Sequence, residues 1–152
     1  MVDSTTPAHT IRPAVATDAS ELARLVTALG HPTTVSELVD RWGPWTTAGN
    51  TALVAVMPDG ALAGLATLHQ TVVLHRPEPV GRITALVVDA SVRGQGIGRS
   101  LVAAAESLLA NAGCGVLEIT SNVRLTEAHS FYCHLGYEQT SFRFAKVLAS
   151  AD

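Results

Sequence analysis

The chain has 152 residues, of which 47% are apolar, and its net charge is -3 at pH 7 with histidine neutral. This length and composition predict one buried core in a single domain over residues 1–152, with residues 1–9 as a flexible N-terminus, and they exclude a disordered tail. The ten Lys and Arg residues are scattered, so we expect no concentrated basic face for nucleic acid or an anionic membrane.

The first residues, the apolar runs and the cysteines of the sequence indicate its cellular compartment. Residues 1–10 lack the layout of a signal peptide, and no apolar run approaches the length of a membrane span. Cys114 and Cys133 are too few and too far apart for a disulfide framework or a zinc site. We therefore expect a cytoplasmic protein with no metal and no membrane partner.

The first elements expected along the chain are a short strand and a helix. Ile11 begins an apolar stretch that Pro13 ends, which predicts the strand. Asp18 followed by Glu21 forms a capping-box pattern ahead of a helix. Apolar residues then recur at helical spacing: Leu22, Leu25, Val26 and Leu29.

A second helix and an antiparallel pair of strands follow. Thr34 and Glu37 repeat the capping pattern, and the predicted helix ends before Gly43, which a proline follows. Residues 51–57 and 62–74 are typical of two strands joined by a tight turn.

The second half of the sequence alternates strands and helices. Strands are predicted over residues 82–88 and 116–120, and helices over 97–112 and 125–135. Residues 137–148 are expected to supply the last one or two strands. Because a helix connects strand 82–88 to strand 116–120, these two should run parallel. The order of elements predicts an α/β (α+β) fold with helices on both faces of a mixed sheet.

The sharpest local pattern is the run Arg-Gly-Gln-Gly-Ile-Gly at residues 93–98, between a predicted strand and a helix. Glycines let the backbone approach a ligand closely, and the free amides of a helix start attract an anion, with a diphosphate as the natural occupant. A P-loop would need a Lys-Ser/Thr pair, and a dinucleotide fingerprint needs another glycine spacing. A glycine-rich turn without a ligand is the remaining alternative.

Two motifs then make the sequence similar to one family. Residues 93–98 resemble the Q/R-x-x-G-x-G/A signature of the GNAT family of acetyl-CoA-dependent N-acetyltransferases, and residues 128–137 resemble its A-x-x-F-Y-x-x-x-G-F/Y motif. The resemblance extends over residues 11–148. It implies a mixed, mostly antiparallel central sheet of six to seven strands, splayed between strands 82–88 and 116–120, with about four helices on both faces.

The resemblance also implies acetyl-CoA as cosubstrate and a set of residues that bind it. The edge of the central strand would pair with the pantetheine arm through Leu86, Val87 and Val88. Asn122 lies where the family often has a polar contact to that arm. The pyrophosphate would lie on backbone amides and the Arg93 side chain, within this set: Arg93, Gly94, Gln95, Gly96, Ile97, Gly98, Arg99 and Ser100.

In the reaction that the resemblance implies, the amine attacks the thioester directly. A backbone amide near Val88 would stabilise the oxyanion. Tyr132, in the second motif, matches the general acid that protonates the coenzyme thiolate. The alternative for Tyr132 is a ring packed in the core with its hydroxyl satisfied elsewhere.

The general base is where the sequence departs from the family. Many relatives carry a carboxylate on the central strand at the position of Thr84, and a threonine cannot act as a base at neutral pH. His69, His75, Glu78 or a chain of water molecules remain as alternatives.

The acceptor is the primary amine of an unidentified small molecule or peptide. By resemblance, its pocket includes the first two helices and their loop, with His31, Trp42 and Trp45. The two tryptophans could recognise an amine, although ordinary core packing is the preferred interpretation. No dense acidic cluster indicates a polycationic acceptor such as an aminoglycoside or a polyamine.

Two other function classes remain open. Because the strand carboxylate is missing, a non-catalytic acyl-CoA-binding sensor or interaction domain is the first alternative. A structural domain that binds no CoA is the second. A homodimer formed through the last strands is a further expectation from the family.

Overall fold

The computed structural model of the chain describes residues 8–149. It divides into two compact units, Met1–Ile119 and Thr120–Asp152, which are described separately. Residues 1–7 of the expected flexible N-terminus lie outside the described residues, whereas His9 is buried. Among residues 8–149, no helix has both the length and the apolar character needed to cross a membrane.

The first unit is built on a mixed sheet of five strands. Their order across the sheet follows their order in the sequence: β1 (Thr10–Pro13), β2 (Thr51–Val56), β3 (Leu62–Thr71), β4 (Val80–Val88) and β5 (Val116–Ile119). The first four strands are antiparallel to their neighbours, and β4 and β5 are parallel, as the sequence predicts.

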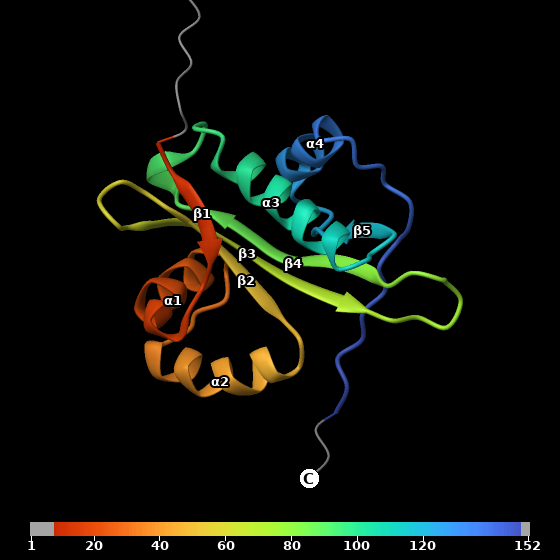
Figure 1. The fold of residues 1–152 in the computed structure, drawn as a ribbon, viewed down its shortest axis with the longest axis horizontal. Helices are drawn as coiled ribbons and strands as arrows, with labels where there is room; N and C mark the ends of the chain where they lie inside the picture. The colour runs from red at the N-terminus through yellow and green to blue at the C-terminus, as the bar shows by residue number, and fades with distance from the viewer. Residues whose placement is uncertain (1–7, 150–152) are drawn as a thin grey trace, which may run out of the picture. The chain divides into compact units, whose positions relative to one another are not determined.

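Helices cover both faces of this sheet (Figure 1). The helical elements of the first unit are η1 (Ala16–Asp18), α1 (Ala19–Ala28), α2 (Val35–Thr47), η2 (Ala90–Val92) and α3 (Ile97–Asn111). The helices α1 and α2 lie on one face, and α3 crosses the other face (Figure 1).

The face that carries α1 and α2 holds a compact apolar cluster. Leu25 of α1, Leu65 of β3 and Val87 of β4 are buried in it. Trp42 and Trp45 of α2 pack against the cluster, with their ring centroids 5.6 Å apart. Core packing is therefore confirmed for both tryptophans.

The opposite face holds α3 at short range. Its apolar stripe is buried through residues such as Ile97 and Leu101. A Cβ atom added at Gly64 of β3 would lie 2.9 Å from a methyl carbon of Leu101. The glycine at this position therefore lets α3 approach the sheet closely.

Two predictions about helix ends are wrong. Asp18 does not cap α1 with its side chain; its carboxylate binds the guanidinium of Arg12 at 2.8 and 2.9 Å and the backbone amide of Val15. The second helix does not end at Gly43 but continues through Pro44 to Thr47. Burial of the two tryptophans on either side of Pro44 stabilises this extension, so that tertiary packing overrides local propensity. The capping box of Thr34 and Glu37 is confirmed.

The expected splay between the two parallel strands is confirmed. β4 pairs with β5 only over Val80–Ile83, and the ladder to β3 contains a bulge in which Thr84 is the extra residue. On the β5 side, the part of β4 after Ile83 therefore has no strand partner among the described residues of the first unit.

The second unit contains one helix, α4 (Thr126–His134), close to its predicted bounds. The expected last strands are absent: residues 135–149 form no strand, and the described sheet has five strands instead of six to seven. Phe142 and Phe144 are 80% and 92% exposed. Residues 137–148 carry aromatic and β-branched residues that favour a strand, but a strand forms only where a ladder pairs it.

Candidate acetyl-CoA site

Two glycines ahead of α3 adopt a backbone conformation that other residues avoid. Gly94 and Gly96 have φ of +82° and +79°, and Gly96 is the N-cap of the helix without any side-chain cap. A Cβ atom at either glycine would meet nothing within 4 Å. These glycines are therefore needed for the turn itself, and the space beside them is open to a ligand.

The start of α3 can bind an anion through its backbone. The first amides of a helix, here those of Ile97, Gly98 and Arg99, have no partner within the helix. The side chain of Ile97 is buried at 1% exposure, so only its amide can reach a ligand. Arg93 and Arg99 are exposed, as is most of the loop between them, including Gln95. This cradle fits a diphosphate, because donors and positive charge surround an open turn.

Ser100 stabilises the loop from inside. Its hydroxyl donates to the carbonyl oxygen of Gly96 at 3.0 Å, and its Oγ lies 2.8 Å from Nε2 of His9. Because the single hydroxyl proton is committed to Gly96, His9 donates through Nε2. His9 lies 91 positions away in the segment expected to be flexible, and no sequence pattern points to it.

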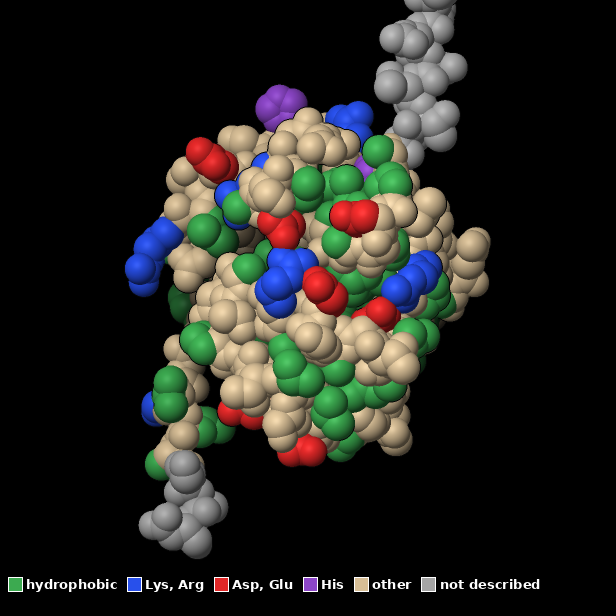
Figure 2. Space-filling view, turned by 90° about the vertical axis from the view of Figure 1, so that its left-hand side faces the viewer, with side chains coloured by type: hydrophobic (Ala, Val, Ile, Leu, Met, Phe, Trp, Pro, Cys, Tyr) green, Lys and Arg blue, Asp and Glu red, His purple; other side chains and the backbone are tan. Residues whose placement is uncertain are grey.

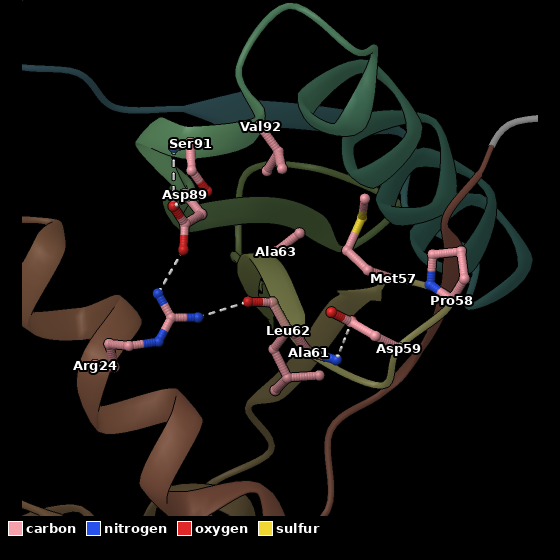
Figure 3. Close-up of a pocket in the computed structure, with 10 residues that line it drawn as sticks. All are labelled: Arg24, Met57, Pro58, Asp59, Ala61, Leu62, Ala63, Asp89, Ser91 and Val92. Carbon is pink, nitrogen blue, oxygen red and sulfur yellow. Dashed lines mark hydrogen bonds and ion pairs between the residues drawn. The ribbon is translucent and has the colours of Figure 1, made fainter.

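An ion pair fixes the segment that leads into the loop (Figure 3). Arg24 of α1 donates to Asp89 and, at 2.7 Å, to the carbonyl oxygen of Leu62 at the start of β3. The amide and hydroxyl of Ser91 also donate to Asp89, at 3.0 and 2.8 Å. These hydrogen bonds, first those of Ser91 and then that of Arg24, lower the pKa of Asp89 from 3.8 to about 2.

The ion pair borders a cavity of about 410 Å³ between α1, the β2–β3 turn and η2. Acidic and basic side chains are interspersed among apolar ones on the face drawn in Figure 2. Arg24 and Asp89 were not predicted as an ion pair from the sequence. The position of Asp89, after a strand and two residues before Ser91, is typical of a local turn only.

The central strand offers a backbone edge beside the loop. Val87 is 8% exposed and packs in the core, so it can contribute only backbone groups. Leu86 and Val88 are half-buried. Because pairing with β5 stops at Ile83, this edge is free within the first unit to bind an extended chain.

The position expected to hold a carboxylate is occupied by a hydrogen-bonded threonine. The hydroxyl of Thr84 lies 2.7 Å from that of Thr67, and it donates to the Thr67 carbonyl oxygen at 3.2 Å. His69 is half-buried on β3, whereas His75 and Glu78 are exposed in the loop before β4.

Two of the residues suggested by resemblance lie in the second unit. Tyr132 is half-buried, with its ring 5.5 Å from that of Phe131 and 6.3 Å from that of Tyr137, and burial raises the pKa of its hydroxyl. Asn122 is exposed, and its side-chain oxygen accepts from the amide of Arg124 at 3.0 Å. The structure thus brings the loop and the β4 edge together in the first unit.

Comparisons with known proteins agree on one family. Residues 20–137 match the model of the acetyltransferase (GNAT) family. The chain is 40% identical over 90 residues to an aminoalkylphosphonate N-acetyltransferase of Salmonella typhimurium, a match that covers 59% of this chain and spans only 58% of that relative's length. It is 31% identical over 136 residues to an aminoglycoside N(6')-acetyltransferase of Stenotrophomonas maltophilia, covering 88% of each.

A solved structure supports the same conclusion. An acetyltransferase of Trypanosoma brucei superposes with a TM-score of 0.80 at 26% identity, covering 92% of this chain and 99% of that chain. The family match includes both the glycine loop and the helix of the second motif. The chain therefore belongs to the acetyltransferase (GNAT) family.

Proposed function

We propose that the protein transfers an acetyl group from acetyl-CoA to a primary amine. The observation that carries this proposal is the uncapped start of α3 behind Gly94 and Gly96, next to a free edge of β4. A diphosphate fits the first feature, and an extended amide-containing arm fits the second. Family membership supports the same cosubstrate.

Each part of the site then has a chemical role. The amides that open α3 bind the pyrophosphate, with Arg93 and Arg99 adding charge from the surface. A backbone amide at the end of β4, near Val88, donates to the carbonyl oxygen of the thioester as the amine attacks. Tyr132 gives its proton to the departing thiolate. Its raised pKa keeps this hydroxyl protonated at neutral pH and above.

The acceptor that we propose is a small amine of low positive charge. The two curated relatives act on different classes, an aminoalkylphosphonate in one and an aminoglycoside in the other. On the strands of this chain, the carboxylate of Glu118 is held by Arg82 at 2.9 Å, so it is not free for a polycation. A small zwitterionic amine fits this balanced surface better than an aminoglycoside does.

The test measures acetylated product by mass spectrometry for three acceptors: aminomethylphosphonate, an aminoglycoside and a peptide with a free N-terminus. We expect the highest kcat/KM for the aminoalkylphosphonate. A higher value for the aminoglycoside would overturn the acceptor class. Tight binding of acetyl-CoA without turnover of any amine would favour a non-catalytic acyl-CoA-binding domain.

A further inference from the structure

One face of the sheet carries a row of polar side chains on β3. Side chains alternate along a strand, so Thr67, His69 and Thr71 share the face on which Leu65 enters the core beneath α1. Arg82 of β4 lies directly opposite His69 in the register. The polar row therefore continues the face of the sheet that carries α1 and α2.

The bulge of β4 directs Thr84 toward the same row. Its hydroxyl is 2.7 Å from the hydroxyl of Thr67, which fixes the two side chains on one face. Thr84 donates to the Thr67 carbonyl oxygen, so the Thr67 hydroxyl donates in turn to Thr84. His69 lies opposite Arg82, two positions before Thr84 on β4. A histidine thus lies near the position at which the family resemblance leads us to expect a carboxylate.

The ring of His69 is held by one of its two nitrogens. Nδ1 lies 3.0 Å from the hydroxyl of Thr71, and Nε2 has no hydrogen-bond partner among residues 8–149. When Nδ1 carries the ring hydrogen and donates it to the Thr71 hydroxyl, the ring orientation is fixed and the lone pair of Nε2 is left to accept a proton. The imidazole is half-buried, so part of the side chain remains accessible.

We propose that Nε2 of His69 removes the proton from the acceptor ammonium; this role rests on the acetyl transfer proposed above. The proton moves to Nε2, and the neutral amine forms a C–N bond with the thioester carbonyl carbon. The C–S bond breaks, the thiolate leaves and takes the proton of Tyr132, and the attacking nitrogen loses its second proton, which restores the tyrosine hydroxyl. His69 then returns its own proton to solvent, so one amide and one thiol result.

Position separates His69 from the other two candidates. His75 and Glu78 precede β4 and lie at the end of the strand opposite to the glycine loop. Glu78 is six residues before Thr84, about 20 Å along an extended chain. Its side chain lies beside Gly115, at the start of β5. Neither residue shares the polar row.

The charged side chain that lies opposite His69 on the neighbouring strand is paired. Arg82 on β4 binds Glu118 on β5 at 2.9 Å, and β2 carries no titratable side chain. On α2, Arg41 lies 3.9 Å from Glu37, and Asp40 is exposed. On the two neighbouring strands, β2 and β4, the only charged side chain is Arg82, and its ion pair with Glu118 neutralises it.

The test compares His69→Gln with His75→Gln, an identical change in the exposed loop. With an amine that the wild-type enzyme acetylates, we expect His69→Gln to lower kcat/KM at pH 7 by about 10²-fold. In a plot of kcat/KM against pH, this variant should lack the inflection that a histidine base gives the wild-type enzyme. Its kcat/KM should instead rise about tenfold per pH unit, as the neutral fraction of the amine increases. The KM for acetyl-CoA should not change, and His75→Gln should match wild type.

Unchanged kcat/KM and an unchanged inflection in folded His69→Gln would overturn the proposal. Absence of turnover in the wild-type enzyme would instead overturn the proposed function, so the two failures are distinguishable. If His69→Gln does not fold, Thr71→Val provides a second test. It keeps the imidazole and removes the hydrogen bond between the Thr71 hydroxyl and Nδ1 of His69. This variant should lower kcat/KM about tenfold with an unchanged KM for acetyl-CoA, and wild-type kinetics would contradict the role.

Discussion

Arg24 on the first helix donates a hydrogen bond to Asp89, 65 residues later, where the central strand leads into the glycine loop. The same guanidinium binds the carbonyl oxygen of Leu62 and the carboxylate of Glu21. One side chain thus connects α1, the start of β3 and the segment before the loop (Figure 3). The cosubstrate site depends on this long-range connection as well as on its glycines.

The connection through Arg24 should support binding of the cosubstrate. Arg24→Met should weaken acetyl-CoA binding by about tenfold, because the segment before the loop loses a charged partner. The free energy of unfolding should fall by about 1–2 kcal/mol. Arg41→Met removes a surface partner of Glu37 on α2 and serves as the control. Calorimetric titration with CoA measures the first effect, and equal affinity in the two variants would contradict it.

Asp89 should make stability depend on pH in the acid range. Its pKa in the folded protein is lowered to about 2 from an ordinary 3.8. A group with a depressed pKa contributes stability that is present above 3.8 and is lost as the pH falls through about 2. The difference in unfolding free energy between wild type and Asp89→Asn should therefore be constant near neutral pH and shrink below pH 4. Urea unfolding at several pH values measures it, and a difference independent of pH would refute this assignment.

The glycine turn allows a matched pair of substitutions. Gly96 and Gly60 both have positive φ, +79° and +90°, with open space where a Cβ would stand. Alanine at either position should cost about 1–2 kcal/mol of stability through the backbone alone. Only Gly96→Ala should also weaken CoA binding, because Gly60 lies in the β2–β3 turn. Equal effects on CoA affinity in both variants would show that the loop does not hold the pyrophosphate.

Tyr132 should act through its hydroxyl. Tyr132→Phe keeps the ring and removes the proton donor, so kcat should fall by about 10²-fold with little change in the KM for acetyl-CoA. The raised pKa predicts that wild-type activity persists above pH 10 before the donor is lost. Tyr137→Phe, whose ring meets Tyr132 edge-on, is the control. Steady-state kinetics across the alkaline range measure both effects, and a turnover unchanged in Tyr132→Phe would remove this residue from the mechanism.

Local patterns in the sequence predicted most of the first unit. The apolar stripe of α3 and the capping box of Thr34 and Glu37 both depend on residues a few positions apart. The crossover from β4 to β5 follows from the connecting helix. The extension of α2 through Pro44 was not predictable in this way, because it depends on the burial of Trp42 and Trp45 against distant strands.

The candidate site was predictable only in part for the same reason. The glycine loop is a continuous motif, and its turn is present as expected. His9 and Ser100 are 91 positions apart, and Arg24 and Asp89 are 65 positions apart, so no local pattern connects either pair. The last strands were expected from propensity alone, and residues 135–149 form none. The homodimer and the cytoplasmic location stay predictions.

The most direct test of acetyl transfer counts both products of the reaction. The purified protein is incubated with acetyl-CoA and the amine panel, and the free thiol and the acetylated amine are quantified over time. Acetyl transfer predicts equal amounts of free thiol and acetylated amine, in excess of the enzyme. Thiol release without an acetylated amine, or no release while CoA binds, would contradict it.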